Sequence, residues 1–140
     1  MDSSQGAVPP RPQVATPSRP SFARAWRLVA AAAALVSAVV HVVLYVDGYD
    51  TIAVVGPLFL LNAVAGVVLA VLLAVWRHWL PLVGGIGFGG LTLLAFVLST
   101  TVGFYGINET FAGTTQLLAA ASEVVVVVAS TAALLREYVR

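Results

Sequence analysis

Four long runs of apolar residues, separated by short polar segments, restrict the fold of this sequence more than any other feature. A bilayer's hydrocarbon core is spanned by about 20 apolar residues in a helix. A helix also satisfies its own backbone hydrogen bonds, which lipid cannot do. We therefore predict an all-α, membrane-embedded, antiparallel four-helix bundle. The predicted helices are 25–46, 52–76, 80–104 and 114–135.

The composition supports a membrane protein and excludes several functions. The 140 residues are 60% hydrophobic and only 9% charged, whereas a soluble domain carries roughly 25% charged residues. A net charge of +1, with no basic stripe, gives no reason to expect nucleic acid as a partner. The absence of cysteine excludes disulfides, thiolate metal sites and dithiol redox chemistry.

The N-terminal segment differs in composition from the rest of the chain. Residues 1–22 hold most of the prolines, with Ser, Gln, Gly and Arg between them. Such a segment buries too little apolar area to offset its ordering entropy, so we expect a disordered cytoplasmic tail before a membrane domain at 23–140. The first apolar run is longer than the roughly 7–15 residues of a signal-peptide core, which favours an uncleaved anchor.

The arginines indicate the orientation. All basic residues fall before or at the start of the first helix, between the second and third helices, or after the fourth. They are Arg11, Arg19, Arg24, Arg27, Arg77, Arg136 and Arg140. The other two connections carry only Asp47, Asp50 and Glu109. The positive-inside rule then predicts a multi-pass plasma-membrane protein with both termini in the cytoplasm.

Polar residues inside the apolar runs give the only candidate site. Glu123 lies in the fourth helix, and an ionised carboxylate facing lipid costs roughly 2.5–3.5 kcal/mol. His41 and Tyr45 share one face of the first helix by i, i+4 spacing, and Asn62 lies near the middle of the second. We expect His41, Tyr45, Asn62 and Glu123 to form a polar pocket open outward beneath Asp47, Asp50 and Glu109.

Two interpretations of this cluster remain open. As a functional site, it would bind a ligand or relay a proton between His41 and Glu123. As a structural feature, it would be a buried hydrogen-bonded network that only fixes the helix register. Gln116 and Ser130 lie seven residues either side of Glu123 and so share its helix face.

Other chemistries find little support. A metal site from His41, Glu123 and a loop Asp would lack a ligand-spacing motif. His78 belongs to the opposite membrane face, so the two histidines cannot be axial ligands of one haem. No aligned nucleophile indicates Ser–His–acid catalysis. We therefore expect no metal, no cofactor and no enzymatic activity.

The glycine-rich segment 84–90 has two interpretations. Gly85, Gly87 and Gly90 fit the dinucleotide fingerprint, but no strand precedes them. Gly85 and Gly89 also form a G-x-x-x-G motif, which permits close approach of membrane helices. We favour helix packing, either within the chain or in a homodimer.

The residues His41-Val-Val-Leu-Tyr45, Gly48-Tyr49 and Val55-Gly-Pro-Leu-Phe-Leu-Leu-Asn62 resemble a group of small four-helix integral membrane proteins of high-GC Gram-positive bacteria. The resemblance covers roughly residues 28–135. It implies a bacterial plasma-membrane protein and carries no catalytic assignment. Small multidrug transporters are also similar in having four short helices and one embedded Glu, but theirs is in the first helix.

Two functions are therefore expected from the sequence. The first is a structural or accessory membrane protein that acts through helix contacts, in a homodimer or a larger membrane complex. The second is a small proton-linked carrier or ligand-binding protein that uses His41, Asn62 and Glu123.

Overall fold

The computed structural model describes residues 22–103 and 113–139. The predicted disordered tail, apart from residue 22, lies outside the described residues, as do Arg11, Arg19, Glu109 and Arg140. The described chain is almost entirely helical and contains no strand, which confirms the all-α bundle. Its elements are α1 (Phe22–Val46), the 3-10 helix η1 (Tyr49–Thr51), α2 (Val55–Val75), α3 (Trp79–Thr101) and α4 (Thr114–Tyr138).

The helix ends follow local backbone chemistry and lie within three residues of the predicted ends. Gly48 turns the chain after α1 with a φ of 125°, a conformation that favours glycine. Thr51 ends η1 and donates to the Gly48 carbonyl at 2.9 Å. His78 caps α3, because its Nδ1 accepts the Leu80 amide at 3.2 Å.

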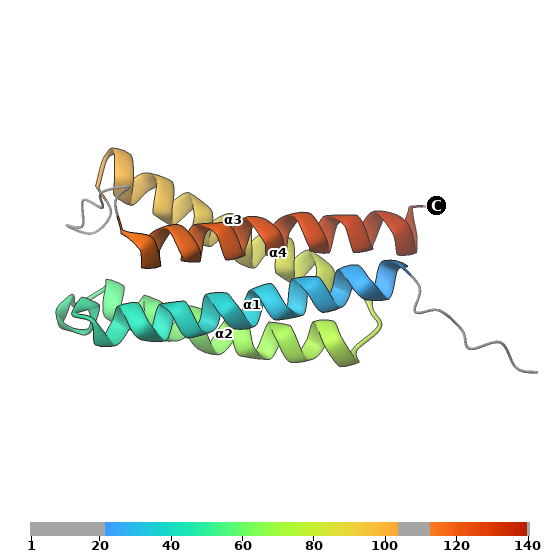
Figure 1. The fold of residues 1–140 in the computed structure, drawn as a ribbon, viewed down its shortest axis with the longest axis horizontal. Helices are drawn as coiled ribbons and strands as arrows, with labels where there is room; N and C mark the ends of the chain where they lie inside the picture. Colours follow the sequence, from blue (N-terminus) through green and yellow to red (C-terminus); the bar gives the residue numbers. More distant parts are fainter. Residues whose placement is uncertain (1–21, 104–112, 140) are drawn as a thin grey trace, which may run out of the picture.

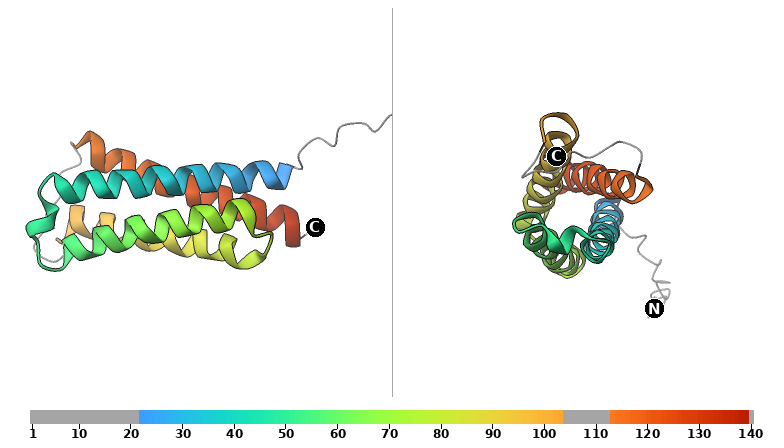
Figure 2. Two further views of the ribbon diagram at one scale, coloured as in Figure 1. Left: turned by 90° about the horizontal axis from the view of Figure 1, so that it is seen from below. Right: turned by 90° about the vertical axis from the view of Figure 1, so that its left-hand side faces the viewer.

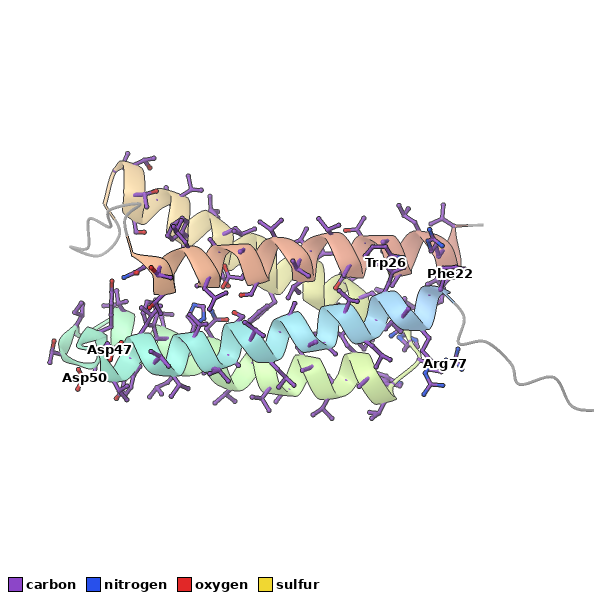
Figure 3. The ribbon with its side chains drawn as sticks, in the orientation of Figure 1. Phe22, Trp26, Asp47, Asp50 and Arg77 are labelled. Atoms are coloured by element: carbon purple, nitrogen blue, oxygen red, sulfur yellow. The ribbon has the colours of Figure 1, made fainter. Side chains whose placement is uncertain are left out.

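The four helices run antiparallel around a common axis, in the order α1, α2, α3, α4 (Figures 1 and 2). α1 packs along both α2 and α4, and α3 packs along α4, whereas α2 and α3 make far fewer contacts. Phe22, Trp26 and Arg77 lie at one end of the bundle, and Asp47 and Asp50 at the other (Figure 3). We call these ends the Arg77 end and the Asp47 end.

The half of the bundle nearer the Arg77 end is filled by a close-packed apolar core. Its centre consists of side chains that are at most 1% exposed, from all four helices. They are Ala30, Ala34, Leu73, Leu82, Val126, Ala129 and Ala133. Small residues in α1 and α4 let the backbones approach closely, as is usual for membrane helices.

The outer surface is strongly apolar. Val39, Leu61, Val64 and Leu91 are each more than 60% exposed, and many other valines and leucines face outward. Contiguous apolar surface of this extent is rare on monomeric soluble proteins and suits contact with lipid. Each of the four helices is long and apolar enough to cross a membrane. The chain is a small membrane protein.

Arg27 joins three segments at the Arg77 end. Its guanidinium forms a bidentate pair with Glu137 of α4, with Nε–Oε1 at 2.8 Å and Nη2–Oε2 at 2.7 Å. It also donates to the carbonyls of Trp76 at 3.2 Å and His78 at 2.7 Å, which follow α2. These bonds hold α1, α4 and the α2–α3 connection together. Arg27 is only 3% exposed.

Candidate functional site

A buried polar network crosses the bundle between α1, α2 and α4. Ser37 Oγ of α1 donates to Glu123 Oε1 of α4 at 3.2 Å. Asn62 Nδ2 of α2 lies 2.7 Å from His41 Nε2 of α1. Ser37, His41 and Glu123 are 0%, 3% and 1% exposed. The structure therefore brings His41, Asn62 and Glu123 together, and Ser37 lies with them.

Both ring nitrogens of His41 have polar neighbours. Its Nδ1 lies 2.8 Å from the Ser37 carbonyl oxygen, and its Nε2 lies 2.7 Å from the Asn62 amide nitrogen. The tautomer of the imidazole determines which ring nitrogen donates. Its Nε2 is 3.7 Å from Glu123 Oε1, which is too long for a hydrogen bond.

The network forms one wall of a cavity of about 400 Å³. The cavity occupies the half of the bundle nearer the Asp47 end and is lined by all four helices and η1. Most of the lining is apolar, and it includes Phe59 of α2 and Phe88 and Phe96 of α3. A mostly apolar cavity with a few convergent polar groups is the usual form of a small-molecule site.

Tyr45 does not lie where we expected it. It is half-buried and does not line the cavity, although i, i+4 spacing aligns it with His41. Tyr49 lines the cavity instead, because the turn at Gly48 brings η1 back over the end of α2. Its ring packs on Phe59 with centroids 4.9 Å apart, and its hydroxyl accepts from Gln116 Nε2 at 3.5 Å. Nothing in the helical periodicity pointed to Tyr49.

The residues that share the Glu123 face of α4 have different surroundings. Gln116 lines the cavity, whereas Ser130 lies in the close-packed half against Gly85 of α3. The Ser130 hydroxyl is buried and has no hydrogen-bond partner among the described residues. Gly85 and Gly89 both face α4, so the G-x-x-x-G motif makes a contact within the chain.

The cavity differs from the pocket expected from the sequence in its lining and in its opening. Leu58 and Leu61 of α2 and Leu91 of α3 line it and are also exposed on the outside of the bundle. Its edge therefore lies between α2 and α3, among leucines. Asp47 and Asp50 are not part of the lining. The described residues contain no group of three or more His, Cys, Asp and Glu side chains that could hold a metal ion.

Comparison with protein-family models, with curated proteins and with solved structures finds no match to this chain. The assignment of function therefore depends on the geometry of the cavity and its polar wall.

Proposed function

We propose that this protein binds a small, uncharged, amphipathic molecule in the cavity of its membrane-embedded bundle. The observation that carries this proposal is the position of the buried network, because His41, Asn62 and Glu123 line an open volume of about 400 Å³. A network that served only to fix helix register would be surrounded by packed side chains, as in the Arg77 half of the bundle.

The same geometry favours a proton-linked form of binding. His41 Nε2 lies 2.7 Å from Asn62 Nδ2 and 3.7 Å from Glu123 Oε1. A ligand that drew the Asn62 amide toward itself would free Nε2 to share a proton with Glu123. Binding and proton position would then be coupled through one amide group. This is the basis for considering the chain a small proton-linked carrier.

The charge distribution supports a location in a bacterial plasma membrane with the Arg77 end in the cytoplasm. Arg24 near the start of α1, Arg77 after α2 and Arg136 near the end of α4 are exposed at that end, and Asp47 and Asp50 are exposed at the other. Positively charged segments remain cytoplasmic when membrane helices insert. Both termini would then be cytoplasmic, and the cavity would lie in the outer half of the bilayer.

A structural or accessory role is the second candidate, and the glycines of α3 favour it. Gly87 and Gly90 have open space where a side chain would be, so another membrane helix can approach α3 closely there. This surface suits a second copy of the chain or a helix of a larger membrane complex. In this case the cavity would have no ligand.

Filling the cavity distinguishes the two candidates. Ala95 of α3 lines the cavity, whereas Val97 of the same helix is 51% exposed on the outside. We expect Ala95→Trp to lose a small molecule that the native protein and the control Val97→Trp retain. The measurement is mass spectrometry of organic extracts from the full chain, purified from native membranes in mild detergent. Identical extracts from all three proteins would contradict ligand binding and leave the structural role.

A further inference from the structure

A second cavity lies at the Arg77 end of the bundle, between the start of α1 and the end of α2. Its volume is about 290 Å³, and its lining consists of three arginines, Arg24, Arg27 and Arg77, and four apolar residues. No aspartate or glutamate of the described residues belongs to this lining. The cavity shares no residue with the one that His41 and Glu123 line. We call it the arginine cavity.

The positive charge of the arginine cavity comes mainly from two of its three arginines. Arg27 is 3% exposed, and its guanidinium pairs with Glu137 of α4, with Nη2–Oε2 at 2.7 Å. Arg24 and Arg77 are exposed. Arg24 lies about one turn before Arg27 in α1, and Arg77 follows the end of α2. The helix dipoles oppose each other here, because α1 begins and α2 ends at the cavity, so the arginines determine its charge.

The apolar part of the lining lies deeper in the bundle than the arginines. Leu28 follows Arg24 along α1, and Leu73, Ala74 and Val75 precede Arg77 along α2. Leu28 and Val75 are 47% and 71% exposed on the outer surface. The arginine cavity therefore has a cationic part toward the end of the bundle and an apolar part that continues onto the surface in contact with lipid.

Two tryptophans place the arginine cavity at the level of the lipid headgroups. Trp76 and Trp79 lie on either side of Arg77 in the sequence, and each is 45% exposed. Exposed tryptophans of membrane proteins gather where the hydrocarbon meets the headgroups. A group that binds to Arg77 would therefore lie at the depth of the lipid phosphates.

We propose that the arginine cavity binds the headgroup of an anionic phospholipid. Its phosphate lies between Arg24 and Arg77, because guanidinium groups bind phosphate oxygens through paired N–H donors. Its acyl chains follow Leu28 and Val75. A zwitterionic lipid fits less well, since its ammonium group would face the same arginines. The proposal does not depend on ligand binding in the other cavity.

The test measures the binding of single lipids to the detergent-purified full chain by native mass spectrometry. The probes are phosphatidylglycerol and phosphatidylcholine with the same acyl chains, added in equal amounts. We expect phosphatidylglycerol to bind about fivefold more tightly, or better. Arg77→Gln should weaken its binding about fivefold, the contribution of one arginine near a membrane surface, and Arg24→Gln should act in the same direction. The binding of phosphatidylcholine should stay the same.

Arg136→Gln is the matched control. Arg136 is exposed at the same end but belongs to α4 and does not line the arginine cavity. Its guanidinium lies over the Phe22 ring, 5.6 Å from the centroid. This substitution removes the same charge, and we expect it to leave the binding of phosphatidylglycerol unchanged. Arg27 is kept in every variant, because its pair with Glu137 joins the helices.

The source of the phosphate is tested with glycerophosphoglycerol, the same headgroup without acyl chains. At equal concentration, we expect it to leave bound phosphatidylglycerol in place, because it lacks the chains that contact Leu28 and Val75. Displacement by it would indicate a site for soluble phosphate groups and would overturn the lipid assignment.

Two further outcomes would contradict a defined lipid site. Equal binding of the two lipids would show that the arginines do not select an anionic headgroup. Equal weakening by Arg136→Gln and Arg77→Gln would show that only the overall positive charge of this end attracts lipid. Neither outcome affects the proposed function, which depends on the extracts from Ala95→Trp.

Discussion

Arg27 carries a charge in a place where the sequence did not indicate burial. Arginine near a helix end commonly extends to the headgroups. Its burial depends on Glu137, 110 residues later, and on two carbonyls after α2, at Trp76 and His78. This contact depends on how the helix ends meet in space, so the residues next to Arg27 in the sequence do not predict it.

Removing the Arg27 side chain should destabilise the bundle. We expect Arg27→Ala to lower the free energy of unfolding by about 2–3 kcal/mol, because Glu137 and the two carbonyls lose their donor. This is below the usual cost of breaking a buried pair, since the Glu137 side chain remains 18% exposed. The exposed Arg77 gives the control, and Arg77→Ala should stay within about 0.5 kcal/mol. Denaturation in detergent micelles measures both, and equal values would contradict the role of Arg27.

The candidate site shows which residues a sequence can and cannot indicate. The expected meeting of His41, Asn62 and Glu123 was argued from the cost of a polar group in lipid, and the three lie together in the structure. That argument needs no knowledge of helix angles. Tyr45 and Tyr49 show its limit, because helical spacing favoured the first while the turn at Gly48 carries the second to the cavity.

The elements themselves were predictable because their signals are local. Apolar length, proline and glycine positions and the arginines of the connections define where each helix begins and ends. The spacing between the helices could not be predicted from local signals. α3 approaches α4 closely at Gly85 and Gly89 yet touches α2 little, and the cavity results from this difference. Several side chains determine that spacing together, so no single run of residues predicts it.

The α3–α4 contact can be tested with two glycines on opposite sides of one helix. A methyl group on Gly89 would lie 2.8 Å from the Glu123 carbonyl oxygen, whereas one on Gly87 would meet nothing within 4 Å. We expect Gly89→Ala to lower the free energy of unfolding by about 1–3 kcal/mol, the usual cost of overpacking. Gly87→Ala should leave it unchanged or raise it by up to about 1 kcal/mol, because alanine favours helix.

Thermal unfolding of both variants in the same detergent measures the difference. The two substitutions add the same methyl group to the same helix, so changes in helix propensity cancel in the comparison. If Gly89→Ala were as stable as Gly87→Ala, α3 would not depend on close contact with α4.

At the scale of the whole molecule, charge divides the bundle into two ends. Exposed arginines lie at the Arg77 end and aspartates at the Asp47 end (Figure 3). The positive-inside rule connects this division to a direction across the membrane. The chain contains no cysteine, so a single introduced thiol can be labelled without background from native residues. The labelling then shows on which side of the membrane that residue lies.

We therefore expect opposite labelling of thiols introduced at the two ends. Asp50→Cys should react with a membrane-impermeant maleimide added outside intact cells, because Asp50 is exposed at the Asp47 end. Arg77→Cys should react only after the cells are permeabilised. The reversed pattern would invert the proposed orientation, and labelling of both from one side would contradict an antiparallel bundle that crosses the membrane.

The leucine-edged opening between α2 and α3 has a consequence for how occupancy should be expressed. Because lipid acyl chains surround this opening, a bound molecule exchanges with molecules dissolved in the lipid. It does not exchange directly with molecules in water. The relevant quantity is then the mole fraction of the solute in the membrane, and doubling the phospholipid at fixed solute would halve that mole fraction. A constant quoted per litre of buffer would describe the partition of the solute as much as the protein.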